Sequence, residues 1–395
     1  MIERDSRHGR EPSTLDGTQT ENQARVGRRA LFISSPDLWR TGFGGKHPLK
    51  PERLARTVAL LSGYHAFDAP GVAVMEPRPA GDDELTLFHT PDYVEAVRGL
   101  SAGHDDLPAH RYGFGRGDNP VFRGMYEISS LKTGGGILGA QALLDGACDV
   151  AFNFSGGLHH ARPARASGFC IFNDAAVAIA WLVAKGRRVA YVDIDAHHGD
   201  GVQDAFYDSD RVLTISLHQD GHTLFPGSGF VEDIGTGAGE GYSVNVPLHP
   251  YTDDAAYLAV FHALVPPLIR RFAPDVLVTQ LGVDTHFRDP LTQMALTTEG
   301  HVALFETFAA LAEMPWLACG GGGYNLDVVP RSWALAFGAM SDQTFGDALP
   351  DHYQETYGGQ WLHDHEGPPL DRATRTQVQR HAEAVVADVR SVHGL

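Results

Sequence analysis

The stretch RVAYVDIDAHHGDG, residues 188–201, indicates the fold class of this chain. It begins as a near-continuous apolar run, typical of a strand buried on both faces of a sheet, and ends in aspartates and histidines. In an extended strand Asp193 and Asp195 point to the same side, and His197 continues that side where the strand ends. Converging carboxylates repel each other unless a cation lies near them, and Asp and His are ligands suited to Zn²⁺. The stretch therefore predicts a metal site; without a metal, Asp193 would cap a helix and His197 would be a solvated loop residue.

Six more runs rich in β-forming residues occur along the chain. They lie at residues 30–35, 72–76, 149–157, 211–218, 275–284 and 315–324. Longer amphipathic stretches separate them, and residues 175–185 and 255–271 have helical character. Apolar strands that alternate with helices predict an α/β fold with a parallel sheet covered on both faces.

Polar residues suited to catalysis follow five of these runs. They are His159 and His160, Asp195 and His197, His218, Asp284, and Tyr324. Open α/β sheets place their active sites at the carboxyl ends of the strands, so these side chains are expected at one edge. Asp284 would supply a third metal ligand and leave a fourth position open for catalysis; its alternative role is the N-cap of a following helix.

The segment GGLHHA, residues 156–161, places two consecutive histidines after a glycine turn. Adjacent side chains diverge, so both rings reach one cavity only from an irregular loop. Asp193 and Asp200 are available to orient one ring each, as a general base and a proton donor require.

The segment CGGGGY, residues 319–324, ends a glycine loop with Tyr324. Glycines let the backbone approach a substrate closely, and a tyrosine hydroxyl beside a polarised carbonyl is an oxyanion donor. The run lacks the Lys-Ser/Thr ending of a phosphate-binding loop, so we do not expect a phosphate site.

Composition limits the classes of partner. The chain has 395 residues and a formal net charge of -18, which argues against general affinity for nucleic acid or anionic membranes, because phosphate binding needs clustered Lys and Arg. Its cysteines, Cys148, Cys170 and Cys319, lie in apolar or glycine-rich runs and predict buried thiols in a reducing compartment. The sequence shows no membrane-length apolar run and no signal-peptide core, so we expect a cytoplasmic protein.

The chain divides into three parts. Residues 1–29 are polar and are expected to form a disordered or loosely held arm. A single catalytic domain is expected over residues 30–340. The tail, residues 341–395, is richer in charge, and its run from Arg372 to Val392 predicts a peripheral helix.

Eight motifs, in order, resemble those of the zinc-dependent histone deacetylase superfamily, and specifically of its class I-like bacterial members, the acetoin utilization proteins. The resemblance covers residues 30–340. The motifs are HPLKPERL (47–54), GDNPVF (117–122), GGLHHA (156–161), ASGFCIFND (166–174), VDIDAHHGDG (192–201), FPGSG (225–229), LGVDTHFRDPL (281–291) and GGGGY (320–324).

The resemblance implies an arginase-like three-layer α/β/α fold with a central eight-stranded parallel sheet. It implies hydrolysis of the N6-acetyl-lysine amide on proteins, such as acetyl-CoA synthetase or other metabolic enzymes, to lysine and acetate. The implied site has Zn²⁺ on Asp195, His197 and Asp284, Asp193 paired with His159, Asp200 paired with His160, and Tyr324 polarising the acetyl carbonyl.

The resemblance also implies substrate and potassium sites. The acyl-lysine tunnel would have Phe169 and Phe225 as its aromatic walls, with Gly168 and Leu291 beside them. Asp118 would hold the substrate backbone, and Arg53 would line an internal acetate channel. One K⁺ would bind near Asp193, Asp195, His197, Ser216 and the Leu217 carbonyl, and a second near Phe206, Ser209, Val212 and Tyr242.

Three alternatives remain open from the sequence. A binuclear manganese ureohydrolase would need further carboxylates, but Gly199 and His286 stand at those positions. An acetylpolyamine amidohydrolase is suggested by the segment THFRDPL after Asp284, whereas Asp118 and HPLKPERL favour a protein lysine. An inactive scaffold or acetyl-lysine binding module is the third. The oligomeric state is not indicated.

Overall fold

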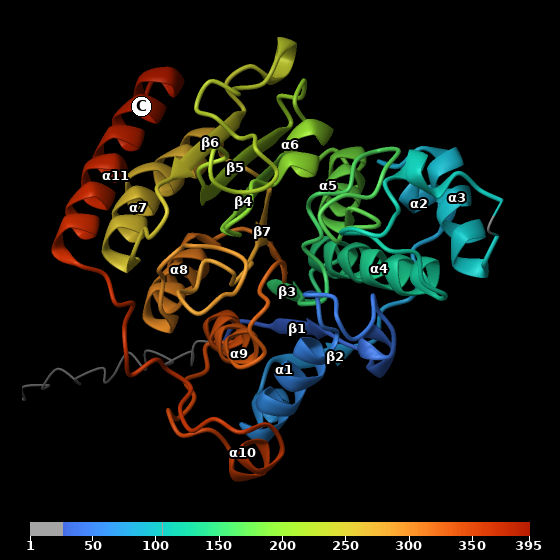
Figure 1. Cartoon of the computed structure of the whole chain (residues 1–395), viewed down its shortest axis with the longest axis horizontal. Helices are drawn as coiled ribbons and strands as arrows, with labels where there is room; N and C mark the ends of the chain where they lie inside the picture. The colour runs from blue at the N-terminus through green and yellow to red at the C-terminus, as the bar shows by residue number, and fades with distance from the viewer. Residues whose placement is uncertain (1–26, 105) are drawn as a thin grey trace, which may run out of the picture.

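A sheet of eight parallel strands forms the centre of the molecule (Figure 1). The structure is a computed structural model that describes residues 27–104 and 106–395. The strands are β1 (Ala30–Ile33), β2 (Val72–Met75), β3 (Val150–Asn153), β4 (Val189–Asp193), β5 (Val212–Gln219), β6 (Ser243–Leu248), β7 (Val276–Gln280) and β8 (Trp316–Cys319). Their order across the sheet is β2-β1-β3-β8-β7-β4-β5-β6.

Helices cover both faces of the sheet. The α-helices are α1 (Glu52–Gly63), α2 (Asp82–Leu85), α3 (Pro91–Ala102), α4 (Met125–Leu144), α5 (Asp174–Ala184), α6 (Asp200–Ala205), α7 (Asp254–Phe272), α8 (Thr298–Leu311), α9 (Val328–Met340), α10 (Asp351–Tyr357) and α11 (Arg372–His393). Short 3-10 turns lie at Pro36–Trp39, Ala66–Asp68, Ala109–Tyr112 and Gly237–Gly239. Figure 1 shows α1, α7, α8, α9 and α11 on one side of the sheet and α4, α5 and α6 on the other.

Alternation along each strand builds the two apolar layers. Ala30 and Phe32 of β1 join the core cluster that contains α1, α7, α8 and α9, while Leu31 and Ile33 join the cluster formed with α4 and α5. Successive strand residues point to opposite faces, so a continuous apolar run fills both layers. The predicted three-layer α/β/α architecture with eight parallel strands is confirmed.

The register brings the carboxyl ends of the central strands to one line. Asp193, the last residue of β4, lies opposite Ser216 of β5 and Gln280 of β7. Cys319, the last residue of β8, lies opposite Gln280 and opposite Asn153 of β3. The loops that carry the candidate site residues therefore leave the sheet side by side.

All seven predicted strand runs form strands, and the structure adds β6 at the sheet edge. The predicted helices over 175–185 and 255–271 are α5 and α7, and the predicted C-terminal helix is α11. Side chains cap the starts of these helices: Asn173, Asp253 and Asp371 accept from backbone amides of the first turns of α5, α7 and α11. The three cysteines are buried and unpaired.

The predicted N-terminal arm, residues 1–29, lies mostly outside the described residues. At its described end, the Arg28 guanidinium donates hydrogen bonds to the carbonyls of Ala309 (2.8 Å) and Ala339 (3.2 Å). Within residues 27–104 and 106–395, no helix combines the length and the apolar character needed to span a bilayer.

Candidate active site

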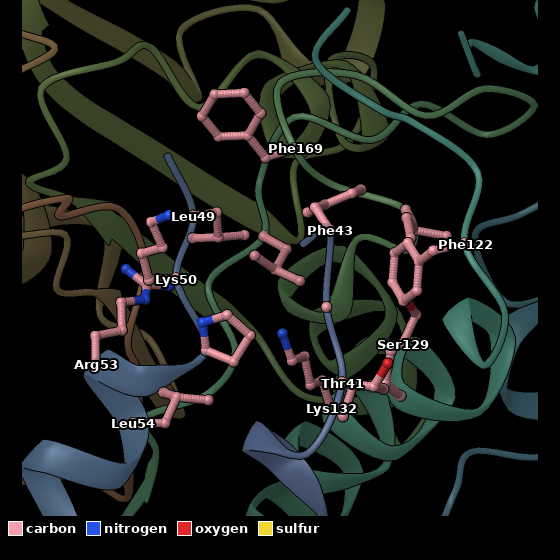
Figure 2. A pocket seen from close by; sticks show the side chains of 15 residues that line it. Thr41, Phe43, Leu49, Lys50, Arg53, Leu54, Phe122, Ser129, Lys132 and Phe169 are labelled. Carbon is pink, nitrogen blue, oxygen red and sulfur yellow. The ribbon is translucent and has the colours of Figure 1, made fainter. Parts of the chain in front are cut away.

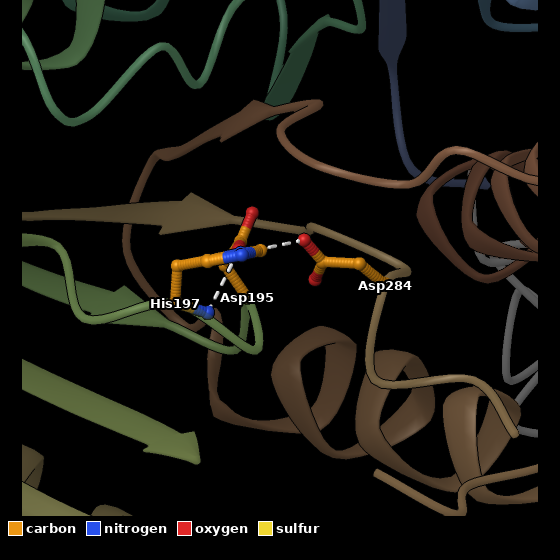
Figure 3. A group of neighbouring side chains, drawn as sticks. All are labelled: Asp195, His197 and Asp284. Atoms are coloured by element: carbon orange, nitrogen blue, oxygen red, sulfur yellow. Dashed lines mark hydrogen bonds and ion pairs between the residues drawn. The ribbon is translucent and has the colours of Figure 1, made fainter. Parts of the chain in front are cut away.

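Three side chains converge at the carboxyl edge of the sheet: Asp195, His197 and Asp284, called the metal group below (Figure 3). One ligand atom from each residue lies within 4.8 Å of the others, and all three side chains are buried. The His197 Nδ1 atom is 3.0 Å from Asp195 Oδ1 and 3.0 Å from Asp284 Oδ2. Asp195 follows β4 and Asp284 follows β7, so two adjacent strands bring the three side chains together.

The charges of this group fit a divalent cation. Burial and the neighbouring Asp195 carboxylate raise the pKa of Asp284 to about 6, because two buried negative charges repel each other. Asp195 is held by the Gln280 side-chain amide (2.7 Å) and by the Gly322 amide (2.8 Å), and the Ala196 amide donates to Asp284 (2.8 Å). Two carboxylates and one imidazole nitrogen form a donor set that fits Zn²⁺ and leaves a fourth position open. Across the described chain, no other cluster of three such ligands occurs.

Two histidines, each with its own carboxylate, lie beside this group. Asp193 Oδ2 is 2.7 Å from Nδ1 of His159, and Asp200 Oδ1 is 2.7 Å from Nδ1 of His160. The two Nε2 atoms are 3.0 Å apart, so both rings turn toward one space. Asp193 also accepts from the Tyr191 hydroxyl (2.6 Å). The implied His–Asp pairs are therefore present in the structure.

The two histidines differ in their affinity for protons. Burial alone would lower the pKa of His159, but the carboxylates of Asp193 and Asp195 outweigh burial and raise that pKa to about 9. Burial and the neighbouring His159 lower the pKa of His160 to about 4, although Asp200 opposes them. In neutral His160 the Nδ1 hydrogen is directed at Asp200, which leaves Nε2 as an acceptor. One ring thus carries a proton while its neighbour is able to accept one.

Tyr324 also lies near this group. Its ring centroid is 6.5 Å from that of His197 and 5.7 Å from that of Phe169. Burial raises the pKa of the Tyr324 phenol well above its ordinary value, so the hydroxyl keeps its proton and remains a donor.

Asp289, which sequence reasoning missed, fixes the backbone around Tyr324. Its carboxylate accepts from the amides of Tyr324 (2.8 Å) and Leu291 (2.9 Å). Burial and the Asp284 carboxylate raise the pKa of Asp289 to about 8. Asp289 lies in the segment 281–291, five residues after Asp284, and this closeness in the sequence could have identified it.

Residues expected at the substrate tunnel lie at or near the surface beside the site. Phe225 is 43% exposed, and its ring centroid lies 5.0 Å from that of His160. Leu291 is also exposed, and its backbone amide donates a hydrogen bond to Asp289. Gly168 packs so closely that an added Cβ would lie 2.4 Å from the His160 ring and 2.9 Å from Phe225. Asp118, Gly168 and Phe225 line one surface groove, so the structure brings these three together.

An internal cavity lies behind the site, and Arg53 and Phe169 line it (Figure 2). Arg53 is buried and donates to the carbonyl of Gly323 at 3.0 Å, directly before Tyr324. Its guanidinium lies 5.0 Å from the ring centroid of Trp333. Arg53 thus lies beside an internal space, and its role in an acetate channel stays a prediction.

The two sets of residues expected to bind potassium lie apart. Ser216 and Leu217 belong to β5 near the metal group, and the Leu217 carbonyl accepts from the Tyr257 hydroxyl (3.3 Å). The second set surrounds the amino end of β5, away from the catalytic edge; it comprises Phe206, Ser209, Val212 and Tyr242.

Two further histidines have structural partners. His218 was expected at the catalytic edge, but β5 continues to Gln219, and the His218 ring nitrogens are 2.9 Å from Ser216 Oγ and 2.9 Å from the Gly229 carbonyl. His198 contacts Ser228 Oγ (2.9 Å) and Gln203 Oε1 (3.1 Å). Neither ring joins the metal group.

A residue of the C-terminal extension supports the loop after Asp284. Asp364 is 2.6 Å from His286 Nε2 and accepts from Arg331 (3.0 Å) and from the Thr298 amide (3.0 Å). The His286 side chain is fully buried in this network. Gly199 stands where a second metal would need the other carboxylate. A Cβ at Gly199 would lie 2.4 Å from Asp193 Oδ2, so a larger side chain does not fit there. No sequence periodicity marks Asp364, which lies in a charge-rich loop.

Comparisons with known proteins agree with this geometry. The family model described as the histone deacetylase domain matches residues 47–340. The chain is 41% identical over 339 residues to the acetoin utilization protein AcuC of Bacillus subtilis, covering 82% of this chain and 86% of that protein. It is 37% identical over 334 residues to histone deacetylase RPD3 of Saccharomyces cerevisiae, covering 84% of this chain and 76% of that protein.

A solved structure agrees as well. The crystal structure of a histone deacetylase homolog from Aquifex aeolicus superposes with a TM-score of 0.81 at 31% sequence identity, covering 91% of this chain and 100% of that chain. With a family model that spans most of the chain, a relative that is 41% identical over most of its length and a solved homolog of the same fold, this chain belongs to the histone deacetylase family.

Proposed function

We propose that the chain is a zinc-dependent protein lysine deacetylase, which hydrolyses N6-acetyl-lysine to lysine and acetate. The observation that carries the proposal is the juxtaposition of the Asp195–His197–Asp284 group with two carboxylate-paired histidines and Tyr324. Membership of the deacetylase family supports the same reaction. One relative's name refers to acetoin utilization, which supports metabolic enzymes such as acetyl-CoA synthetase as substrates.

A bound Zn²⁺ would supply Lewis acidity at the acetyl carbonyl and increase the acidity of a water molecule. The chain's own residues then divide the remaining work. His160 Nε2 takes the proton of the attacking water, because the Asp200 contact leaves that nitrogen as the acceptor. The Tyr324 hydroxyl donates to the carbonyl oxygen as negative charge develops there. His159, which the Asp193 carboxylate keeps charged, stabilises the anionic site and supplies a proton toward the leaving lysine nitrogen.

Structural potassium ions at one or both of the predicted sets belong to this proposal. The buried Asp193 carboxylate and the Ser216 and Leu217 oxygens support the first set. We also propose a cytoplasmic location, which three buried, unpaired cysteines support.

The test is turnover of an acetyl-lysine peptide by the zinc-loaded chain, with Tyr324→Phe as the diagnostic variant. Losing one oxyanion donor should lower kcat by about a hundredfold or more. Tyr324→Phe keeps the ring and its packing, so its melting temperature should stay close to that of the wild type. Wild-type turnover in this variant would contradict the role of Tyr324, and absence of acetate release from any acyl-lysine peptide would contradict the function.

Acetylspermidine is the comparison substrate, because it tests the polyamine alternative with the same assay. Asp118 is exposed beside Phe225 on the groove at the entrance, where a peptide backbone would pass. We therefore expect a higher kcat/KM for the peptide than for acetylspermidine, and a lower peptide kcat/KM in Asp118→Asn. Faster turnover of acetylspermidine would favour the polyamine reaction.

A further inference from the structure

The internal cavity behind the catalytic site has an unusual charge balance. Side chains of Lys50, Arg53 and Lys132 line it, and no carboxylate is found among its lining residues (Figure 2). The rest of the lining is mainly apolar, and the cavity is narrow, with a volume of about 30 Å³. A largely apolar space with several cations and no anion is suited to a ligand that carries negative charge.

Lys132 is the cation whose charge is least compensated. The Lys50 amine contacts the Gly45 carbonyl, and Arg53 donates to the Gly323 carbonyl. In contrast, the Lys132 ammonium makes no hydrogen bond or ion pair with the described part of the chain, although its backbone carbonyl accepts from Asn153. Figure 2 shows its amino end directed into the space between the lining side chains.

The electrostatic surroundings of Lys132 agree with this picture. Burial and the neighbouring Arg53 lower the pKa of Lys132 to about 8. The amine is therefore mostly charged at neutral pH, but its charge is destabilised by burial and by the nearby guanidinium. Asp174 is the acidic group that opposes this effect, yet its oxygens accept from the amides of Gly157 (2.9 Å) and Leu158 (2.8 Å). A carboxylate entering the cavity would therefore meet an ammonium that has no counter-ion.

The cavity lies next to Tyr324, whose hydroxyl is proposed to contact the acyl carbonyl. Phe169 and Leu158 line it, and Phe169 also contacts Tyr324 across 5.7 Å between ring centroids. Leu158 directly precedes the two catalytic histidines in the chain. An acyl chain that extends beyond the reacting carbonyl would thus enter this apolar space and point its far end toward Lys132.

We propose that the cavity binds the distal carboxylate of a dicarboxylic acyl group, so that the chain hydrolyses lysines bearing short ω-carboxyacyl groups such as succinyl or glutaryl. This rests on the proposed deacylase function and extends its substrate class. Water oxygen adds to the acyl carbon, the carbon–nitrogen bond breaks, the lysine nitrogen takes the proton, and a dicarboxylate leaves. Lys132 pairs with the distal carboxylate and takes no part in the bond changes.

The test compares peptides that carry succinyl-lysine and butyryl-lysine, which have the same number of acyl carbons and differ in the terminal charge. For the zinc-loaded wild type we expect a ratio of kcat/KM, succinyl over butyryl, above one. Loss of a charge-assisted contact in Lys132→Met should lower this ratio by about tenfold or more. Lys132→Arg keeps the charge and should retain most of the ratio. Lys185→Met, which removes a lysine that lies over Trp181 outside the cavity, should leave the ratio unchanged.

A binding measurement separates this inference from the proposed function. Glutarate should raise the melting temperature of the wild type more than butyrate does, and this difference should vanish in Lys132→Met but persist in Lys132→Arg. If acetyl-lysine is hydrolysed while the wild type prefers butyryl-lysine, or if Lys132→Met keeps the wild-type ratio, the inference is wrong and the deacetylase function stands. If no acyl-lysine peptide is hydrolysed, the function fails, and the melting temperatures alone decide whether the cavity binds a dicarboxylate.

Discussion

Asp289 holds the backbone on both sides of the candidate site. Its carboxylate accepts hydrogen bonds from the amides of Tyr324 and Leu291. Asp289→Ala should lower kcat about tenfold, because a lost hydrogen-bonding partner of about 1.4 kcal/mol is enough to let Tyr324 shift. Asp289→Asn keeps an acceptor oxygen and should retain most of the activity. Steady-state kinetics with an acetyl-lysine peptide checks this, and equal losses in the two variants would contradict it.

Gly157 sits where two loops meet over the sheet edge. Its φ is +84°, and an added Cβ would lie 2.7 Å from the backbone nitrogen of Gly321. Gly146 also has a positive φ, +66°, but nothing lies within 4 Å of an added Cβ. Gly146→Ala should therefore cost only about 1 kcal/mol of backbone strain, whereas Gly157→Ala should cost at least about 2 kcal/mol more and reduce activity. Urea unfolding measures both, and equal free-energy losses would count against the close approach.

At the scale of elements, the extension between α9 and α11 completes the loop after β7. Burial would raise the pKa of Asp364, but His286, the Thr298 amide and Arg331 outweigh burial and hold that pKa well below its ordinary value. The carboxylate therefore stabilises the fold above roughly pH 4, the ordinary carboxyl range, and this contribution is lost as the pH falls through the lower folded-state pKa.

We predict that Asp364→Asn lowers the free energy of unfolding by about 3 kcal/mol at pH 7, as expected when a buried ion pair loses one partner. The difference from the wild type should begin to shrink below about pH 4, where the carboxylate of the unfolded chain takes up a proton, and should vanish below the lower folded-state pKa. Denaturant unfolding at several pH values gives the measurement. A difference that is independent of pH would mean that packing rather than charge is lost.

The sequence predicted seven strands because their apolar runs are continuous, and the elements it missed have physical reasons. β6 reads SVNVPL, in which Asn245 and Pro247 break the apolar run; proline is tolerated there because the strand lies at the sheet edge. In α4 the run from Gly134 to Gly136 conceals the helix. The helix needs these glycines, since a Cβ on Gly134 would lie 1.8 Å from the Arg78 carbonyl.

The candidate site also contains residues that the sequence predicted and residues that it missed. Asp195, His197 and Asp284 were found because each directly follows or ends a recognisable strand, and parallel strands deliver their ends to one edge. Asp364 and Lys132 could not be found this way. Each reaches its place through a loop or helix whose path depends on tertiary packing, and neither residue type is rare enough to stand out in the sequence.

For the molecule as a whole, the metal group links two adjacent strands, because Asp195 and His197 follow β4 and Asp284 follows β7. Removing the metal with a chelator should lower the melting temperature, because a ligand present at about a thousand times its Kd contributes about 4 kcal/mol to the folded state. Adding Zn²⁺ back should restore both the melting temperature and deacetylation. His197→Ala should show the lower melting temperature without a chelator and should not respond to Zn²⁺. A chelator that abolishes activity without shifting the wild-type melting temperature would contradict this coupling.

The pairing of His286 with Asp364 also bears on the order in which the protein is made. The two residues are 78 positions apart. At about 5 to 20 residues per second, a ribosome adds that segment in roughly 4 to 16 seconds. The last strand, β8, is completed within this interval, and from Arg331 onward the guanidinium lacks its carboxylate partner until Asp364 is added. A nascent chain therefore carries its catalytic groups before it is able to hold them in place, and we expect its enzymatic activity to begin only once Asp364 has emerged and docked.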